Sequence, residues 1–327
     1  MTPIRPGIAS PALQSAPDAE LLRGGTVAGP PEGGPHVASS LERGTYEARA
    51  GCAPPARSVA RAGQGRLRVE RSGSRSVVTR AYATSPLRLL TPSNHGSASW
   101  IYTSSYGGGF VDGDCLDVEV EIGRGAAAYL STQAATKVYR SPSGTRATLH
   151  ARVDEDALFV LAPDPVVCFA GARYRQEQRF EIAPGAGLIV IDAIVSGRHA
   201  AGERWAFLEY HSLIEVTIGG RMAAYDPVAL RAADGPLAAR LGRFEVLATA
   251  VLAGAALRDE TTQVIAACSR EPLARRGDLV MAASPLGQDG CIVRLGATST
   301  ELLARALRGL LHFLPSRLDD DPWRRKW

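Results

Sequence analysis

The stretch ALFVLAPDPVVCFAGARYRQEQRFEIAPGAGLIVIDAIVSGR, residues 157–198, decides the fold class of this chain. It contains short runs of apolar or alternating residues, and Gly, Pro or Asp closes each run. Val, Ile, Phe and Tyr favour strands over helices. Repeated short strands with frequent turn residues are typical of an all-β sandwich, a barrel or a stacked-sheet solenoid. The stretch therefore predicts a mainly β protein.

The same pattern extends on both sides of this stretch. Residues 115–123, CLDVEVEIG, alternate strictly, which predicts a half-buried strand with an acidic outer row. Residues 65–82 predict a hairpin that turns at Ser72-Gly73-Ser74. Only two segments predict a helix. One is residues 228–242, which follow Asp226-Pro227, and the other is residues 301–314, which follow a capping-box pattern and carry leucines at helical spacing.

The beginning of the chain differs in composition from the rest. Residues 1–62 are rich in Pro, Gly, Ala and Ser and show no sustained period of 2 or 3.6. Such a segment buries too little apolar surface to offset the entropy of ordering, so we predict a disordered tail. We predict a single β-rich domain over residues 63–327.

Composition excludes several function classes. The formal net charge is only +4 over 327 residues, and the arginines are scattered, so no stripe for nucleic acid is evident. No apolar run approaches the roughly 20 residues of a membrane span, and the N-terminus lacks the apolar core of a secretory signal. We expect a cytoplasmic protein. The five cysteines form no C-x-x-C pair or zinc-finger spacing, and common catalytic and nucleotide-binding motifs are missing.

Two acids stand out. Pro163 and Pro165 hold Asp164 on extended backbone just ahead of an apolar run, where it either belongs to an ordinary loop or forms a metal site with Cys168. Asp192 lies within an apolar run, and a buried carboxylate needs a partner. We expect a salt bridge to an arginine such as Arg173 or Arg198. The alternative is a carboxylate that faces a polar channel.

Five blocks in order resemble the urease accessory protein UreD family, called UreH in some species. The blocks are SYGGGFVDGD (105–114), YLSTQAATKVYRS (129–141), PDPVVCFAGARYRQ (163–176), SGRHAAGERWAF (196–207) and GRFEVLAT (242–249). The resemblance covers residues 65–327. It implies a stacked-sheet, β-helix-like single domain with two helical segments. It also implies a protein that is not an enzyme but a nickel-insertion chaperone, which docks on apo-urease and recruits UreF and, through UreF, the GTPase UreG.

The resemblance also implies where nickel passes. Asp164 and Asp192 stand where the family places acids of a proposed internal nickel path, and Glu203 is a weaker candidate. No cofactor is expected to bind tightly, since nickel is only in transit. Many members have Leu-Glu-Trp where this chain has Phe159-Val160-Leu161, so one acid of that path is missing here.

Two further expectations concern the C-terminal end of the chain and an alternative function. Trp323 and Trp327 lie in a basic, aromatic tail and are expected to bind partners. A β-solenoid carbohydrate-binding protein or hydrolase is the alternative function, motivated by the strand pattern and the Gly107-Gly108-Gly109 turn.

Overall fold

Two β-sheets are the main elements of the computed structural model, which describes residues 62–93, 95–272 and 274–324. These residues belong to one compact unit. The predicted disordered tail lies outside the described residues except for Ala62, which begins the first strand. None of the helices in the described part of the chain combines the length and the apolar character needed to cross a membrane.

Sheet A has seven strands. In spatial order they are β14 (Arg221–Arg231), β13 (Glu209–Ile218), β11 (Arg173–Ile182), β8 (Thr145–Val153), β5 (Cys115–Ile122), β1 (Ala62–Ser72) and β2 (Arg75–Ala83). The outermost pairs β1–β2 and β13–β14 are antiparallel, and the inner pairs are parallel. The predicted hairpin is β1–β2, and the predicted alternating strand is β5, whose apolar side chains are buried.

Sheet B has ten strands. Its main path is β16 (Leu279–Pro285), β17 (Gly290–Ala297), β15 (Val246–Ala253), β12 (Gly187–Val195), β9 (Leu158–Leu161), β6 (Ala127–Thr132), β4 (Ser99–Ser105) and β3 (Leu87–Leu90). Two short strands, β10 (Val166–Cys168) and β7 (Lys137–Val138), extend it beside β12. The run from β4 to β12 along this path is parallel, and the remaining pairs of the path are antiparallel.

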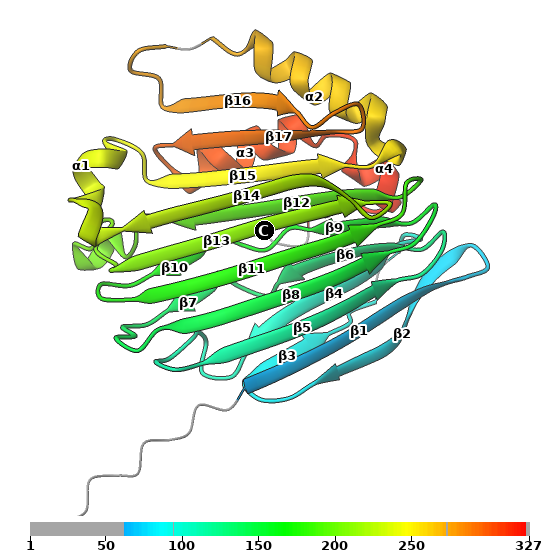
Figure 1. Ribbon diagram of the computed structural model, residues 1–327, viewed down its shortest axis with the longest axis horizontal. Helices are drawn as coiled ribbons and strands as arrows, with labels where there is room; N and C mark the ends of the chain where they lie inside the picture. The colour runs from blue at the N-terminus through cyan, green and yellow to red at the C-terminus, as the bar shows by residue number, and fades with distance from the viewer. Residues whose placement is uncertain (1–61, 94, 273, 325–327) are drawn as a thin grey trace, which may run out of the picture. The chain divides into compact units, whose positions relative to one another are not determined.

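The chain alternates between the two sheets over its middle third (Figure 1). From β4 to β13, ignoring the short β7 and β10, each strand of sheet B is followed by one of sheet A. Successive strands within a sheet are therefore parallel neighbours, which is the connectivity of a coil with two strands per turn. The mainly β, stacked-sheet and β-helix-like fold is confirmed.

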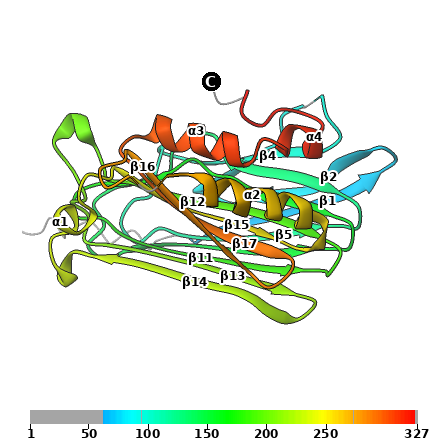
Figure 2. The same cartoon turned by 90° about the horizontal axis from the view of Figure 1, so that it is seen from above.

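Helices cover one face of sheet B (Figure 2). They are α2 (Arg258–Arg270), α3 (Thr300–Leu310) and α4 (Leu314–Leu318), while the short α1 (Leu237–Leu241) lies between β14 and β15. The predicted C-terminal helix is confirmed as α3. Its N-cap is Ser299, whose hydroxyl accepts the Leu302 N–H at 3.2 Å. The described residues contain four short α-helices, two more than the pair of helical segments expected.

Two physical reasons explain the helix errors. Residues 228–231 belong to β14 rather than to a helix, because an edge strand tolerates Pro227, which lacks an N–H for the ladder. Of the predicted segment only α1 is α-helical. Helix α2 was missed because its first residue follows Leu257 without a side-chain cap and its surface is mostly polar. Its buried face is formed by Glu260, Thr261, Val264 and Cys268.

Apolar side chains form two layers of core. One layer lies between the sheets, and the other lies between sheet B and the helices. Strand β12 is buried on both faces, so Leu188 and Val190 point into the first layer, and Ile189 and Ile191 point into the second. By this alternation Asp192 points between the sheets.

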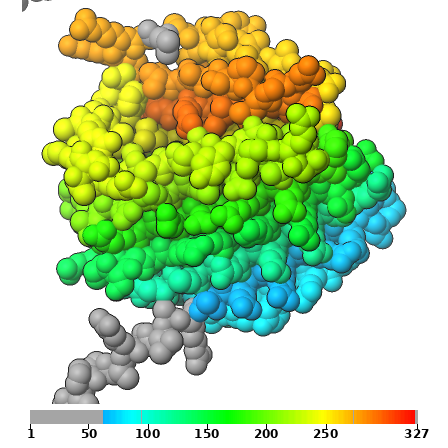
Figure 3. Space-filling view, in the orientation of Figure 1, coloured from blue at the N-terminus to red at the C-terminus, as the bar shows by residue number. Residues whose placement is uncertain are grey.

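The outer face of sheet A is open to solvent on the side seen in Figure 3. Arginines and acids alternate across its strands, as in the ion pairs Arg66–Glu119 and Arg179–Glu215. The side chains of these pairs are between 27% and 66% exposed, so each pair contributes little to stability. This face is a solvated surface whose charges are largely matched.

Candidate functional site

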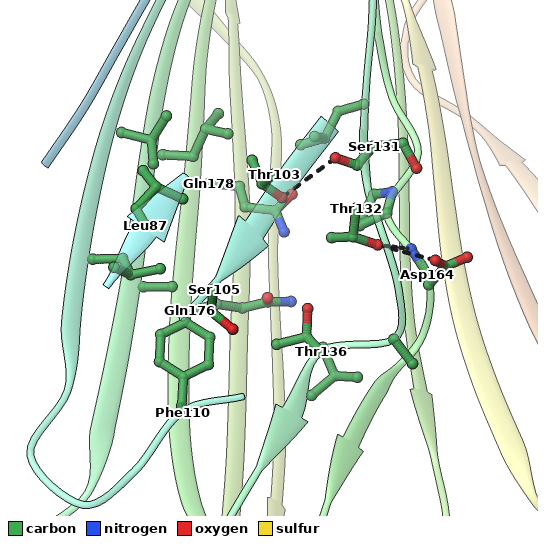
Figure 4. Close-up of a pocket in the computed structure, with 18 of the residues that line it drawn as sticks. Leu87, Thr103, Ser105, Phe110, Ser131, Thr132, Thr136, Asp164, Gln176 and Gln178 are labelled. Carbon is green, nitrogen blue, oxygen red and sulfur yellow. Dashed lines mark hydrogen bonds between the residues drawn. The ribbon is translucent and has the colours of Figure 1, made fainter. Parts of the chain in front are cut away.

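A cavity of about 190 Å³ lies between the two sheets (Figure 4). Its polar lining consists mainly of hydroxyl, amide and carboxyl groups, contributed by Thr103, Ser104, Ser105, Ser131, Thr132, Thr136, Thr148, Asp164, Gln176, Glu177, Gln178 and Asp192. Apolar side chains such as Leu87, Phe110 and Leu161 complete the walls. The two acids singled out from the sequence therefore line one space, although 28 positions of chain separate them.

Asp192 is 7% exposed and is held by three neutral groups of sheet A. Its Oδ1 accepts a hydrogen bond from Gln176 Nε2 at 2.6 Å, and its Oδ2 accepts one from Ser212 Oγ at 2.6 Å. The hydroxyl of Tyr210 lies 3.1 and 3.2 Å from the two oxygens. The expected salt bridge is wrong, because Arg173 pairs with Glu209 and Arg198 pairs with Glu203. Asp192 instead lines the cavity between the sheets, and the alternative of a polar channel stays a prediction.

Burial raises the pKa of Asp192 above its usual range. The hydrogen bonds from Ser212, Gln176 and Tyr210 oppose this shift, and the nearby charge of Asp226 adds to it. The carboxyl group therefore keeps its proton to a higher pH than an exposed aspartate does. A cation that approached it would compete with that proton.

Asp164 lies at the edge of the same cavity. The Thr132 hydroxyl accepts the backbone N–H of Asp164 at 2.8 Å and donates to its Oδ2 at 3.2 Å (Figure 4). Because Pro163 and Pro165 fix the flanking backbone, this pair of contacts sets the direction of the carboxylate. The half-buried side chain thus combines a fixed position with access to solvent.

Asp164 also lines a larger groove on the other side of sheet B, between that sheet and α3. The groove and the cavity share six lining residues: Thr132, Ala134, Ala135, Pro163, Asp164 and Ala193. The groove and the cavity are therefore neighbours that meet at these residues, Asp164 among them. Asp192 lines the cavity and is not part of the groove lining.

Gln178 is a cavity residue that the sequence did not single out. It is 7% exposed, and its Oε1 is buried without a hydrogen-bond partner in the described part of the chain. The side chain points into the space between the sheets, as does that of Gln176 (Figure 4). A buried amide oxygen without a partner is costly unless water or an ion occupies the space beside it. A Gln at every second position of a strand, as in RYRQEQRF, was the available signal.

Glu203 lies elsewhere. Its carboxylate forms an ion pair with Arg198 and accepts the backbone N–H of Ala170 at 3.1 Å. The hydrogen bond from Arg198 lowers its pKa, against a smaller opposing effect of burial. Glu203 does not line the cavity, and it fixes the loop before β13 to the chain after β10.

Ser196, His199 and Glu245 meet beside this loop, but their geometry is not that of a catalytic triad. His199 Nε2 lies 3.0 Å from Ser196 Oγ and 2.8 Å from Glu245 Oε2. In a triad the serine and the carboxylate use different imidazole nitrogens. Here the hydroxyl donates directly to Glu245 at 2.5 Å, so the cluster serves to hold the loop.

The remaining candidates divide between core and surface. Cys168 is 1% exposed and burial raises the pKa of its thiol, so it behaves as a small apolar residue rather than as the partner of Asp164. Trp323 is half-buried and packs on the layer between sheet B and the helices. Trp327 lies outside the described residues. Among the residues that the structure describes, no group of three or more His, Cys, Asp or Glu is arranged to hold a metal ion.

Comparison with known proteins gives one consistent family. The family described as UreD urease accessory protein matches residues 61–327. A urease accessory protein UreD of Sorangium cellulosum is 49% identical over 83% of this chain and 86% of its own length. A urease accessory protein UreD of Anaeromyxobacter is 45% identical, and the match covers 90% of its length. A urease accessory protein D of rice is 36% identical, and the match covers 98% of its length.

Proposed function

The chain belongs to the UreD family of urease accessory proteins and has a role in urease maturation; on this premise we propose how it acts. It docks on apo-urease in the cytoplasm and recruits UreF and, through UreF, the GTPase UreG. Nickel then passes through the chain by way of Asp164 and Asp192. The protein acts as a chaperone of metallocentre assembly and not as a hydrolase.

One observation supports the proposed nickel path. Asp164 and Asp192 line the same cavity, and Asp164 also lines the groove outside it. A cation that entered from the groove would meet the accessible carboxylate first and the buried one second. Glu203 is left out of the proposed path, because its carboxylate is engaged by Arg198 away from the cavity.

The chemistry of the lining suits transit rather than storage. Carboxylate, hydroxyl and amide oxygens bind nickel more weakly than clusters of imidazole or thiolate do. A volume of about 190 Å³ has room for about six water molecules at roughly 30 Å³ each, so an ion could keep part of its hydration shell. The Gln178 oxygen, which has no hydrogen-bond partner in the described part of the chain, offers one more weak ligand or an acceptor for that shell.

The test compares assembly with nickel loading. Urease would be produced with the wild-type chain, with Asp164→Ala or with Asp192→Ala, and both variants should still co-purify with UreF and urease. Nickel content and urease activity should fall for each variant. Loss of co-purification equal to the loss of nickel would show that these acids are structural. Normal urease activity after deletion of the whole gene would overturn the role in maturation itself.

A further inference from the structure

The groove beside α3, called here the α3 groove, has features of a docking surface. It runs between α3 and sheet B, and its apolar lining includes Leu89, Leu90, Pro92 and Tyr102. Exposed or half-exposed apolar surface of this kind, bordered by charged residues, is typical of a site for another protein.

The charged side chains that line the α3 groove differ in whether they already have hydrogen-bond or ion-pair partners. Asp164 is held by Thr132, and Glu301 lies in the first turn of α3, where backbone and side-chain hydrogen bonds lower its pKa. Arg305 and Arg308, on the following turns of α3, are exposed. Among the described residues neither guanidinium has an ion-pair or hydrogen-bond partner, in contrast to most of the arginines on sheet A.

We propose that the α3 groove is the docking site for an acidic segment of a partner protein in urease maturation. Carboxylates of the segment pair with Arg305 and Arg308, and its apolar side chains fill the space beside Leu89 and Tyr102. Arginine is well suited to such contacts, because its planar guanidinium binds a carboxylate through two hydrogen bonds. This inference rests on the proposed function only in the choice of partner.

Docking in the α3 groove would also affect the surroundings of Asp164. Because Asp164 lines both the groove and the cavity, a segment seated in the groove would lie over Asp164 and beside the cavity. Docking would then shield Asp164 from bulk water on this side and place the partner next to the first acid of the proposed path.

A pair of charge reversals tests the site in the full-length chain. The variant carries Arg305→Glu and Arg308→Glu, and its affinity is measured for purified UreF and, separately, for purified apo-urease. Affinity for one of the two should fall by about tenfold or more, because attraction at close range becomes repulsion. The matched control carries Arg80→Glu and Arg221→Glu, two exposed arginines on sheet A without ion pairs in the described part of the chain. It should bind both proteins as the wild type does.

A labelling experiment reports on the groove without reversing a charge. In an Ala304→Cys variant the new thiol lies on the lining of the α3 groove, and half-buried Cys115 at the start of β5 serves as an internal reference. The partner whose affinity depends on the arginines should slow maleimide labelling at residue 304 and leave Cys115 unchanged. If the charge-reversed chain does not fold, Arg305→Gln with Arg308→Gln repeats the affinity measurement.

Four outcomes would overturn the proposal. One is equal binding of both proteins by the groove variant and the control. Another is unchanged labelling at residue 304 in the presence of either partner. The third is a dimer of the wild-type chain, seen by light scattering and dissolved by the charge reversal, because the occupant would then be a second copy. A groove variant that activates urease normally, in cells where gene deletion abolishes activation, would remove this proposal and leave the proposed function standing.

Discussion

Gln176 on β11 donates a hydrogen bond to Asp192 on β12, and the 2.6 Å contact joins the two sheets across the interior. The same Nε2 lies 3.0 Å from Ser212 Oγ and 3.2 Å from the Tyr210 hydroxyl. The carboxyl group is thus the centre of a buried polar network whose other members all come from sheet A. Networks of this kind are stable only when each member has a partner.

Gln176→Leu should therefore destabilise the protein. The substitution removes a donor from a buried carboxyl group, and we expect a loss of about 1–3 kcal/mol in the free energy of unfolding. Urea titration measures it. Gln178→Leu is the matched control, since Gln178 lies two residues away, is equally buried, and its Oε1 has no partner among the described residues. An equal loss for the two variants would contradict the importance of the network.

Asp192→Asn should change how stability depends on pH. A carboxyl group whose pKa is raised in the folded state favours folding at low pH, and this contribution disappears as pH rises through the raised pKa. Asparagine does not titrate. The melting temperature of the variant, relative to the wild type, should therefore increase as pH rises. Thermal unfolding at a series of pH values checks this, and a difference independent of pH would mean that Asp192 has an ordinary pKa.

Thr132→Val should lower nickel loading of urease, though less than Asp164→Ala does. Valine removes the hydroxyl that fixes the Asp164 carboxylate but leaves the carboxylate in place. Nickel per urease active site, measured by mass spectrometry after co-expression, gives the comparison. Thr103→Val is a suitable control, because its hydroxyl lines the cavity and contacts the Ser131 carbonyl rather than Asp164. Full loading by Thr132→Val would mean that the orientation of Asp164 is unimportant.

The ion pair between Arg294 on β17 and Asp226 on β14 joins an edge strand of sheet A to sheet B. The side chain of Asp226 is 8% exposed, whereas that of Arg294 is 55% exposed. Arg294→Met should therefore destabilise the protein more than Asp226→Asn, because it leaves a buried carboxylate unpaired, at a cost of about 1–3 kcal/mol. Denaturant titration of the two variants tests this order. Removal of the exposed pair Arg66–Glu119 should have a much smaller effect.

Glu203→Gln separates a structural acid from the proposed path. The variant loses the ion pair with Arg198 and weakens the contact with the Ala170 N–H, so its melting temperature should fall. Nickel loading of urease should stay normal at a temperature where the variant is folded. A marked loss of nickel without a loss of stability would return Glu203 to the path.

Several features followed from the sequence because they depend on local forces. Alternation in residues 115–123 predicted a strand with one buried face, and β5 has it. The spacing of leucines after Ser299 predicted α3. Pro163 and Pro165 placed Asp164 on extended backbone, and Asp192 was singled out as a carboxylate that an apolar environment does not readily accept. The helix predicted after Pro227 failed because the proline is tolerated at a sheet edge, and only pairing with β13 reveals that edge.

The sequence by itself determined where strands form and which carboxyl groups need a partner, because alternation, proline geometry and the cost of burying charge act within a few residues. Only the tertiary structure decided that Asp192 is held by Gln176, Tyr210 and Ser212 rather than by an arginine. It also brought Asp164 to the same cavity and gave the Gln178 oxygen no partner among the described residues. These relationships depend on how the strands of one sheet lie against those of the other, and that register is set by packing across the whole core.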